Sequence, residues 1–270
     1  MSSGSAFLDR ILATKRDSMS AVSSVERRET HAAALQAVGL RTEKRLFLKA
    51  LQRKDRINII AEIKRSSPSA GAIHQDADAV AIASTYERAG AAAISVLTES
   101  EYFRGSLQDL ADVATRVKTP LLRKDFTVDR HQIYEAAVAG ASAILLIVAA
   151  LSDAELADLR TVAEQELGLD ALVEAHSARE AERALACGAS IVGVNNRNLQ
   201  TLEISLETSR ELARFIVNDQ VFISESGIRT ASDIDALREL GYNGFLVGET
   251  LMRATDPAAA LRALCAGGQQ

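Results

Sequence analysis

Residues Thr119–Phe126 read TPLLRKDF, in which two leucines run directly into Arg123, Lys124 and Asp125. Such an apolar run is typical of a buried strand, and its abrupt charged end indicates a core element that delivers a charged group to a site. The same pattern recurs in AEIKRSSPS (Ala61–Ser69), ALVEAH (Ala171–His176), IVGVNNRN (Ile191–Asn198), VFISESG (Val221–Gly227) and FLVGET (Phe245–Thr250). A fold that collects these strand ends in one place would explain the sequence.

The segments between these runs repeat as well. Each apolar strand is followed by a polar loop, a helix of about three turns and a return that contains glycine, the residue that ends helices in the left-handed conformation. Two helix starts, Ser152 with Glu155 and Ser177 with Glu180, fit the capping box. The expected strands are Ile57–Ile63, Ala92–Leu97, Pro120–Arg123, Ala143–Val148, Ala171–Glu174, Ile191–Val194, Val221–Ser224 and Gly244–Val247.

Eight strands that alternate with helices predict an α/β fold, a single closed (β/α)8 TIM barrel. The alternative is an open doubly wound sheet, but no glycine-rich dinucleotide fingerprint follows the first strand. We expect one domain over residues 1–270, with an N-terminal helical extension at 1–50 and the barrel at 55–265. In a barrel, all the strands open with their carboxyl ends on one face.

Composition narrows the class of protein. The net charge of −5 combines interspersed charges of both signs, which argues against a nucleic-acid partner. Cys187 and Cys265 lie in alanine-rich helical stretches and are typical of core residues in a reducing compartment. No signal peptide is evident, and the longest apolar stretch, near Ala143–Leu151, is far below the roughly 18 residues of a membrane helix. We therefore expect a cytoplasmic protein without a membrane partner, either a monomer or a weak dimer.

Small residues after the seventh and eighth strands predict an anion site. Ser226-Gly227 and Gly248-Glu249 lead into helical turns, where free backbone N–H groups can hold a phosphate, although two ordinary turns would read the same way. Ser67, in the loop after the first strand, could close over the same group.

Charged residues at the strand ends predict acid–base chemistry. Glu62 and Lys64 are two apart on one strand and therefore face the same side. Any one such residue could be a rim salt bridge, but several of both signs inside a barrel favour a site for an anionic substrate. The further members are Lys124, Glu174, Asn195, Arg197 and Glu225.

The sequence does not suggest a metal or a nucleophilic triad. His31, His74, His131 and His176 do not cluster, and no His, Asp and Glu group has metal-ligand spacing. There is no G-x-S-x-G elbow. Covalent catalysis is disfavoured, with the exception of a Schiff base on Lys124 or Lys64.

The chain resembles the indole-3-glycerol phosphate synthase family from its N-terminal helix to its last turn. The motifs that carry the resemblance are IAEIKRSSPS (Ile60–Ser69), SVLTESEYFRGS (Ser95–Ser106), LLRKDFTVDRHQIYEA (Leu121–Ala136), GVNNRNL (Gly193–Leu199), ISESGI (Ile223–Ile228) and LVGETLM (Leu246–Met252). The resemblance implies that 1-(2-carboxyphenylamino)-1-deoxyribulose 5-phosphate becomes indole-3-glycerol phosphate, losing carbon dioxide and water, without a cofactor. It also implies N-terminal helices that help to cover the substrate.

The resemblance also assigns roles. Lys124 matches the general acid that protonates the substrate ketone, and Glu174 matches the carboxylate that assists dehydration. Lys64 matches the lysine that binds the substrate carboxylate and takes part in proton transfer, and Glu62 holds the lysines in place. The other matches are Asn195 and Arg197 (substrate positioning), Glu225 and Ser226 (a polar pair beside them), Phe103 (near the anthranilate ring), and Ser67, Gly227 and Gly248 (phosphate grip).

Two expectations concern charge. Lys124 can act as an acid near neutral pH if a neighbouring cation or desolvation lowers its pKa, and Lys64 is the candidate neighbour. Glu249 stands where many family members have serine, so its backbone N–H, with Gly248, would have to bind the phosphate.

Two alternatives stay open at this point. One is another phosphate-binding barrel enzyme such as phosphoribosylanthranilate isomerase, which uses Cys/Asp or Asp/Asp pairs where this chain has Lys and Glu. The other is a non-catalytic sugar-phosphate sensor on the same fold, which would tolerate loss of Lys124.

Overall fold

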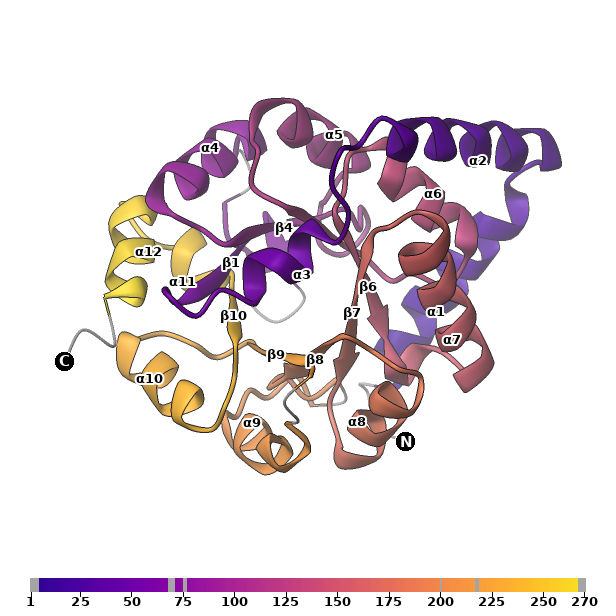
Figure 1. Cartoon of the computed structure of the whole chain (residues 1–270). Helices are drawn as coiled ribbons and strands as arrows, with labels where there is room; N and C mark the ends of the chain where they lie inside the picture. Colours follow the sequence, from indigo (N-terminus) through magenta and orange to yellow (C-terminus); the bar gives the residue numbers. More distant parts are fainter. Residues whose placement is uncertain (1–4, 68–70, 75–76, 200, 217–218, 267–270) are drawn as a thin grey trace.

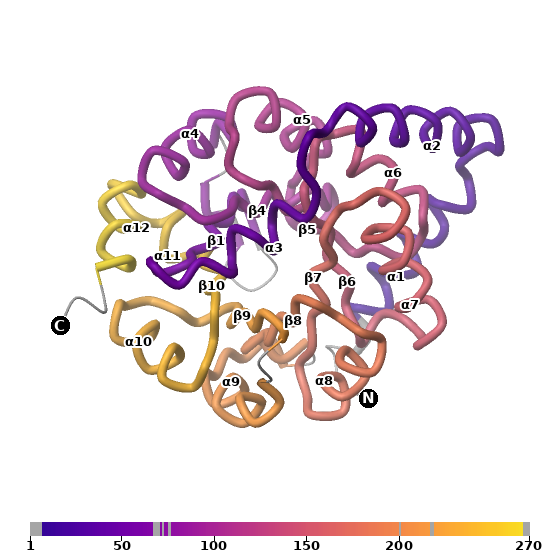
Figure 2. Tube along the Cα trace, viewed as in Figure 1, coloured from indigo at the N-terminus to yellow at the C-terminus, as the bar shows by residue number. Residues whose placement is uncertain are grey.

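Eight parallel strands form a closed barrel in the computed structural model, which describes residues 5–67, 71–74, 77–199, 201–216 and 219–266. Neighbours around the ring follow the order β1-β10-β9-β8-β7-β6-β5-β4, so the last strand closes on the first (Figures 1 and 2). The strands are β1 (Asn58–Ile63), β4 (Ala93–Leu97), β5 (Leu121–Lys124), β6 (Ala143–Ile147), β7 (Asp170–Ala175), β8 (Ile191–Asn195), β9 (Val221–Glu225) and β10 (Gly244–Val247). The predicted barrel is confirmed, and each expected strand end lies within one residue of an observed one.

Every residue of β1, β4, β6, β7, β9 and β10 is buried, as continuous apolar runs covered on both faces require. The strand register sets the polar ends at neighbouring heights. Lys124 pairs with Leu97, Glu174 with Ile147, and Glu225 with Asn195. The charged residues therefore meet at the carboxyl-terminal mouth.

Helices follow the strands and form the outer ring in Figure 1. They are α4 (Ala79–Ala89), α5 (Leu107–Arg116), α6 (Arg130–Val138), α7 (Asp153–Thr161), α8 (Ala178–Ala186), α9 (Glu207–Leu212), α10 (Ala231–Glu239), α11 (Glu249–Met252) and α12 (Pro257–Cys265). Short 3-10 or π turns occupy Val148–Ala150, Val162–Glu166 and Ala213–Phe215. A small hairpin that the sequence did not predict, β2 (Ser66–Ser67) with β3 (Gly71–Ala72), follows β1.

The two expected capping boxes differ. Ser152 and Glu155 form the reciprocal pair at the start of α7, as predicted. At α8, Ser177 accepts the Glu180 N–H, but the Glu180 carboxylate accepts the backbone N–H of His176 instead, at 2.9 Å. Glu180 is thereby drawn toward His176 and not toward the Ser177 backbone.

The N-terminal extension consists of α1 (Ser5–Ala21), α2 (Ser24–Gly39) and α3 (Leu46–Leu51). Helix α2 packs on α6, and α3 crosses the middle of the ring of strands (Figure 1). Phe47 and Leu51 of α3 are fully buried, and Asp170 at the start of β7 accepts the Leu48 N–H at 3.0 Å. Helix α3 thus closes the amino-terminal end of the barrel.

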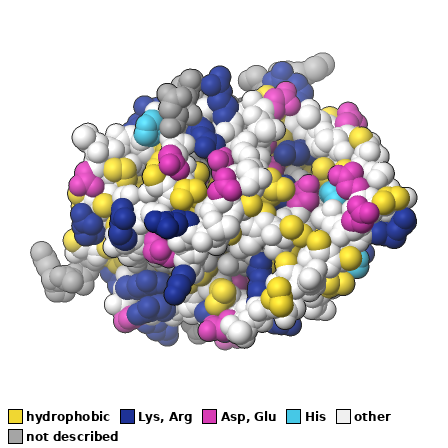
Figure 3. All heavy atoms as spheres, turned by 90° about the horizontal axis from the view of Figure 1, so that it is seen from above, with side chains coloured by type: hydrophobic (Ala, Val, Ile, Leu, Met, Phe, Trp, Pro, Cys, Tyr) yellow, Lys and Arg dark blue, Asp and Glu magenta, His cyan; other side chains and the backbone are white. Residues whose placement is uncertain are grey.

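The surface carries Lys, Arg, Asp and Glu side chains that are interspersed over the face seen in Figure 3. Within the described ranges, no helix is both long enough and apolar enough to cross a membrane.

We expect Phe47→Ala to lower the free energy of unfolding by about 3–5 kcal/mol, because a fully buried ring is lost and a cavity remains. Urea denaturation followed by circular dichroism measures the change. Leu40→Ala, at a side chain that is 79% exposed, is the control and should stay within about 0.5 kcal/mol of the parent. A loss below about 1 kcal/mol for Phe47→Ala would mean that α3 does not seal the barrel.

Candidate active site

A cavity of about 440 Å³ opens at the carboxyl ends of the strands, within the size range of small-molecule sites. The structure brings together in its lining twelve of the residues predicted from sequence: Glu62, Lys64, Phe103, Lys124, Glu174, Asn195, Arg197, Glu225, Ser226, Gly227, Gly248 and Glu249. The backbone of Ser67 belongs to β2, while its side chain lies outside the described part of the chain.

Lys124 is the centre of the site. Its Nζ donates a hydrogen bond to Glu174 Oε2 at 2.9 Å and lies 3.4 Å from Glu225 Oε2. The three side chains come from β5, β7 and β9, and both carboxylates are at most 2% exposed. At the end of β1, Lys64 Nζ donates to Glu62 Oε1 at 2.6 Å. The ammonium groups of Lys124 and Lys64 therefore share one cavity with the carboxylates of Glu174, Glu225 and Glu62.

Burial sets the electrostatics of this cluster. Burial lowers the pKa of Lys124, but the charges of Glu174, Glu225 and Glu62 outweigh it, so the pKa is raised above that of an ordinary lysine. The expectation that Lys64 lowers this pKa is wrong for the free chain. Lys64 is itself paired with Glu62, and three carboxylates act on Lys124.

The pKa values of the two carboxylates beside Lys124 are shifted in opposite directions. Burial raises the pKa of Glu174, but Lys124 and His176 outweigh it and bring the pKa well below the usual range. Lys124 lowers the pKa of Glu225, but burial and the negative charges of Glu174 and Glu62 outweigh this effect and raise the pKa to about 8. At neutral pH, Glu174 is therefore a carboxylate and Glu225 is mostly a carboxylic acid. Such a split is typical of acid–base sites.

Two glycines make room for the buried carboxylates of Glu225 and Glu62. A Cβ at Gly193 would lie far inside contact distance of Glu225 Oε1, and a Cβ at Gly248 would do the same to Glu62 Oε1. Only residues without a side chain leave these buried carboxylates in place. Gly193 is the first residue of the motif Gly193–Leu199, but the sequence did not show that it leaves room for Glu225 on the neighbouring strand β9.

The loops after β8 and β9 form one rim of the cavity. Ser226 and Gly227 both have positive φ angles, 67° and 84°. Asn196 donates its side-chain amide to the carbonyl oxygens of Glu225 and Ser226, at 3.0 and 3.1 Å. Asn195 Oδ1 accepts the backbone N–H of Arg197 at 3.0 Å. Asn196, which sequence reasoning had not singled out, therefore fixes the strained turn where phosphate is expected.

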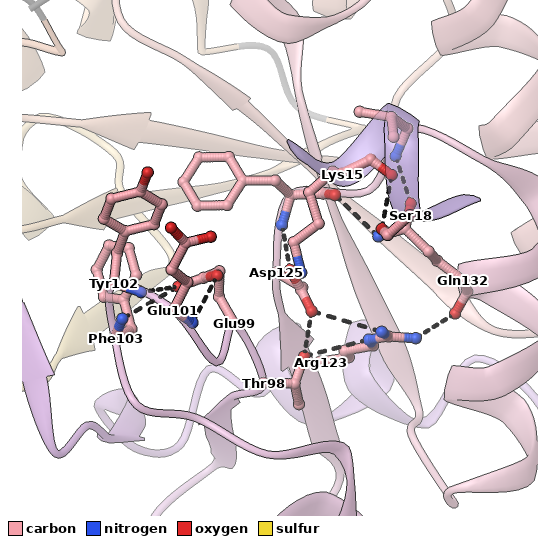
Figure 4. Close-up of polar contacts among 12 residues, drawn as sticks. Lys15, Ser18, Thr98, Glu99, Glu101, Tyr102, Phe103, Arg123, Asp125 and Gln132 are labelled. Carbon is pink, nitrogen blue, oxygen red and sulfur yellow. Dashed lines mark hydrogen bonds and ion pairs between the residues drawn. The ribbon is translucent and has the colours of Figure 1, made fainter. Parts of the chain in front are cut away.

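An aromatic wall lies opposite that rim. The rings of Phe103 and Phe126 are 6.2 Å apart, centroid to centroid, and both line the cavity. Glu99 accepts the backbone N–H groups of Glu101, Tyr102 and Phe103, which fixes the loop after β4 (Figure 4). The wall suits a planar ring in a site that is otherwise charged.

Helix α1 is joined to this wall through a buried network that the sequence did not reveal. Lys15 Nζ lies 2.7 Å from Asp125 Oδ1, while Thr98 donates to Asp125 Oδ2 at 2.7 Å (Figure 4). Arg123 contacts the same carboxylate at 3.4 Å. Asp125 directly follows Lys124, so the extension is anchored beside the central residue of the site.

His176 also lies closer to the site than the sequence indicated. Its Nε2 is 3.2 Å from Glu174 Oε1, the oxygen that does not contact Lys124. Among the residues that the structure describes, no group of three or more His, Cys, Asp and Glu is arranged to hold a metal ion.

We expect Lys15→Met to release α1 from the barrel, because Asp125 then keeps Arg123 but loses the cation that comes from the helix. Amide hydrogen exchange in residues 7–20 should quicken by at least about tenfold, with the strands unchanged. Arg16→Met is the matched control on the same helix: Arg16 also contacts the barrel, at Glu155 and the Ala150 carbonyl, but its side chain is 47% exposed. Equal exchange in the two variants would contradict an anchoring role for Lys15.

The comparisons with known proteins agree with this geometry. A family model described as indole-3-glycerol phosphate synthase matches residues 8–264. Proteins with that name from Lachnoclostridium phytofermentans and Ruminiclostridium cellulolyticum are 47% identical over 220 residues and 51% identical over 208 residues. These matches cover 82% and 77% of this chain, and 81% and 80% of the relatives.

Solved structures show the same fold at low sequence identity. The 3-hexulose-6-phosphate synthase of Salmonella typhimurium superposes with a TM-score of 0.63 and 13% identity, over 77% of this chain and 96% of that one. This likeness concerns the barrel alone. The family match over nearly the whole chain goes further: the chain belongs to the indole-3-glycerol phosphate synthase family.

Proposed function

We propose that this chain converts 1-(2-carboxyphenylamino)-1-deoxyribulose 5-phosphate to indole-3-glycerol phosphate at the mouth of the barrel. It is then a carboxy-lyase of tryptophan biosynthesis, as its family implies. The observation that carries the proposal is the buried ammonium of Lys124 between Glu174 and Glu225, inside a cavity with an aromatic wall.

Ring closure needs an acid at the ketone. As the ring carbon that bears the carboxylate attacks, the ketone oxygen becomes alkoxide-like and takes a proton from Lys124. The raised pKa of Lys124 keeps it charged beforehand, and an alkoxide is basic enough to accept the proton. Glu225, with its pKa near 8 and 3.4 Å away, can return a proton to the neutral amine.

Decarboxylation follows from the same step. Attack turns the anilino nitrogen into an iminium, and the electrons of the bond to the departing carbon dioxide flow into it and restore the aromatic ring. Lys64, beside Glu62 on β1, is placed to hold the carboxylate until it leaves. No external oxidant or reductant is required, so we propose no cofactor and no metal.

Dehydration completes the indole. The hydroxyl left on the former ketone carbon departs as water after taking a second proton, and the methylene carbon beside the nitrogen loses one. Glu174 is the base for that carbon, because Lys124 and His176 keep it ionised. Over the whole reaction, one proton is taken up for each water released.

The rim after β8, β9 and β10 would bind the rest of the substrate. We assign the phosphate to the backbone N–H groups at Gly227, Gly248 and Glu249, with Ser67 closing over it. The Glu249 carboxylate is engaged by Arg253 at 3.0 Å, which offsets its charge near the phosphate. Asn195, Arg197 and Ser226 would orient the sugar chain, and Phe103 would stack near the anthranilate ring.

We also propose that the protein acts in the cytoplasm as a monomer or weak dimer, on a small anionic substrate and without nucleic acid. Cys187 and Cys265 are free thiols, in keeping with a reducing compartment. Phosphoribosylanthranilate isomerase is not favoured, because the relatives at 47–51% identity bear the synthase name. A non-catalytic sensor would bind the substrate without turning it over.

Lys124→Ala should lower kcat by at least about a hundredfold while substrate still binds, because the proton donor is lost but the rim is not. Indole fluorescence, followed after adding the substrate without cofactor or metal, measures turnover. Lys118→Ala, at an exposed lysine close by in the chain, should leave the rate unchanged. Near-normal turnover by Lys124→Ala would remove Lys124 from the mechanism, and no turnover by the parent would favour a sensor.

A further inference from the structure

A second cavity, of about 460 Å³, lies beside the first one. Asn195, Arg197 and Leu199 line both cavities, whereas His176 lines only the second and Glu174 only the first. The imidazole therefore stands between the two cavities. It reaches the back of the Glu174 carboxylate from the side away from the ammonium of Lys124.

Two carboxylates hold the ring of His176. Nδ1 lies 3.1 Å from Glu180 Oε2, and Nε2 lies 3.2 Å from Glu174 Oε1. The Nε2 contact is off the direction of an ideal hydrogen bond, so this pairing is chiefly one of opposite charges. Since both ring nitrogens face carboxylate oxygens, both must carry a proton to avoid repulsion, and the ring is an imidazolium.

Glu180 fixes the ring from the far side. The same carboxylate oxygen accepts the backbone N–H of His176 at 2.9 Å, and Ser177 donates its hydroxyl to the other oxygen at 3.2 Å. This is the departure from the expected capping box at α8. The start of the helix is therefore built to orient His176.

The other charged groups around this cavity are Asp9 of α1 and Arg197 of the loop after β8. Burial lowers the pKa of His176, but its hydrogen bond to Glu180 and the negative charges of Glu174 and Glu180 outweigh burial and raise the pKa to about 9. The pKa lies above the usual value of about 6.5, so the charge is fully present below that value and is lost as pH rises through about 9.

We propose that His176 is a positioning residue for the reaction, an imidazolium that holds the Glu174 carboxylate in place and ionised opposite Lys124. The inference rests on the proposed role of Glu174 as the base in dehydration. Each oxygen of Glu174 then has its own cation, Lys124 on Oε2 and His176 on Oε1. Loss of the imidazolium leaves one oxygen without a partner and weakens the preference for the ionised form.

His176→Gln keeps a polar side chain of similar length and removes the charge. We expect kcat to fall roughly tenfold or more with little change in KM. His31→Gln is the matched control, since His31 also pairs with a carboxylate, Glu166 at 2.8 Å, but is far more exposed. The kcat of this control should match that of the parent.

A titration that does not depend on turnover separates this inference from the proposed function. NMR of the ring carbon signals of His176 should give a midpoint near 9 in the parent, and Glu180→Gln and Glu174→Gln should each lower it. If His176→Gln loses its fold, these two variants still decide the question. A midpoint near or below 6.5 in the parent, or an unchanged kcat in folded His176→Gln, would overturn the proposal.

Discussion

The ion pair between Lys124 and Glu174 is the constraint on which the rest of the site depends. An ammonium that is 14% exposed and a carboxylate that is 2% exposed could not both be charged in a barrel core without each other. Their pairing requires that β5 and β7 end at matching heights, which the barrel register provides through β6. The fold therefore brings the ammonium of Lys124 and the carboxylate of Glu174 together, and this ion pair marks the centre of the site.

The surroundings of this pair give Glu174 and Glu225 different protonation states. Glu174, in contact with two cations, is held ionised, while Glu225, with one weaker contact and two negative neighbours, holds a proton at neutral pH. Gly193 leaves space for the carboxylate of Glu225, and Gly248 does the same for Glu62. Two glutamates a few ångströms from the same ammonium group therefore differ in protonation at neutral pH.

Much of this could be predicted from the sequence, because barrel strands are local features. The apolar run before Lys124 is followed directly by charged residues, which predicts a buried strand with a charged end. The same pattern placed Glu174 and Glu225 at the ends of their strands. Parallel strands place their carboxyl ends together, so convergence followed from the fold class.

What the sequence could not give were contacts between distant segments. The hydrophobic periodicity of α1 predicts a helix but does not show where it packs, so the contact of Lys15 with Asp125 could not be predicted. Gly193 is required only because Glu225 lies next to it on the neighbouring strand. His176 was visible two residues after Glu174, but its pairing became apparent only with Glu180 turned toward it. The pKa of Lys124 was misjudged for the same reason, because Lys64 pairs with Glu62 and the nearest charges are carboxylates.

The most direct measurement is an NMR titration of the carbon next to the ammonium of Lys124, assigned by comparison with Lys124→Ala. If buried carboxylates hold this lysine charged, its signal should keep the ammonium shift beyond the pH, about 10.4, at which exposed lysines titrate. It should titrate earlier when Glu174 is replaced by Gln. A Lys124 that loses its proton before the exposed lysines do would contradict the account.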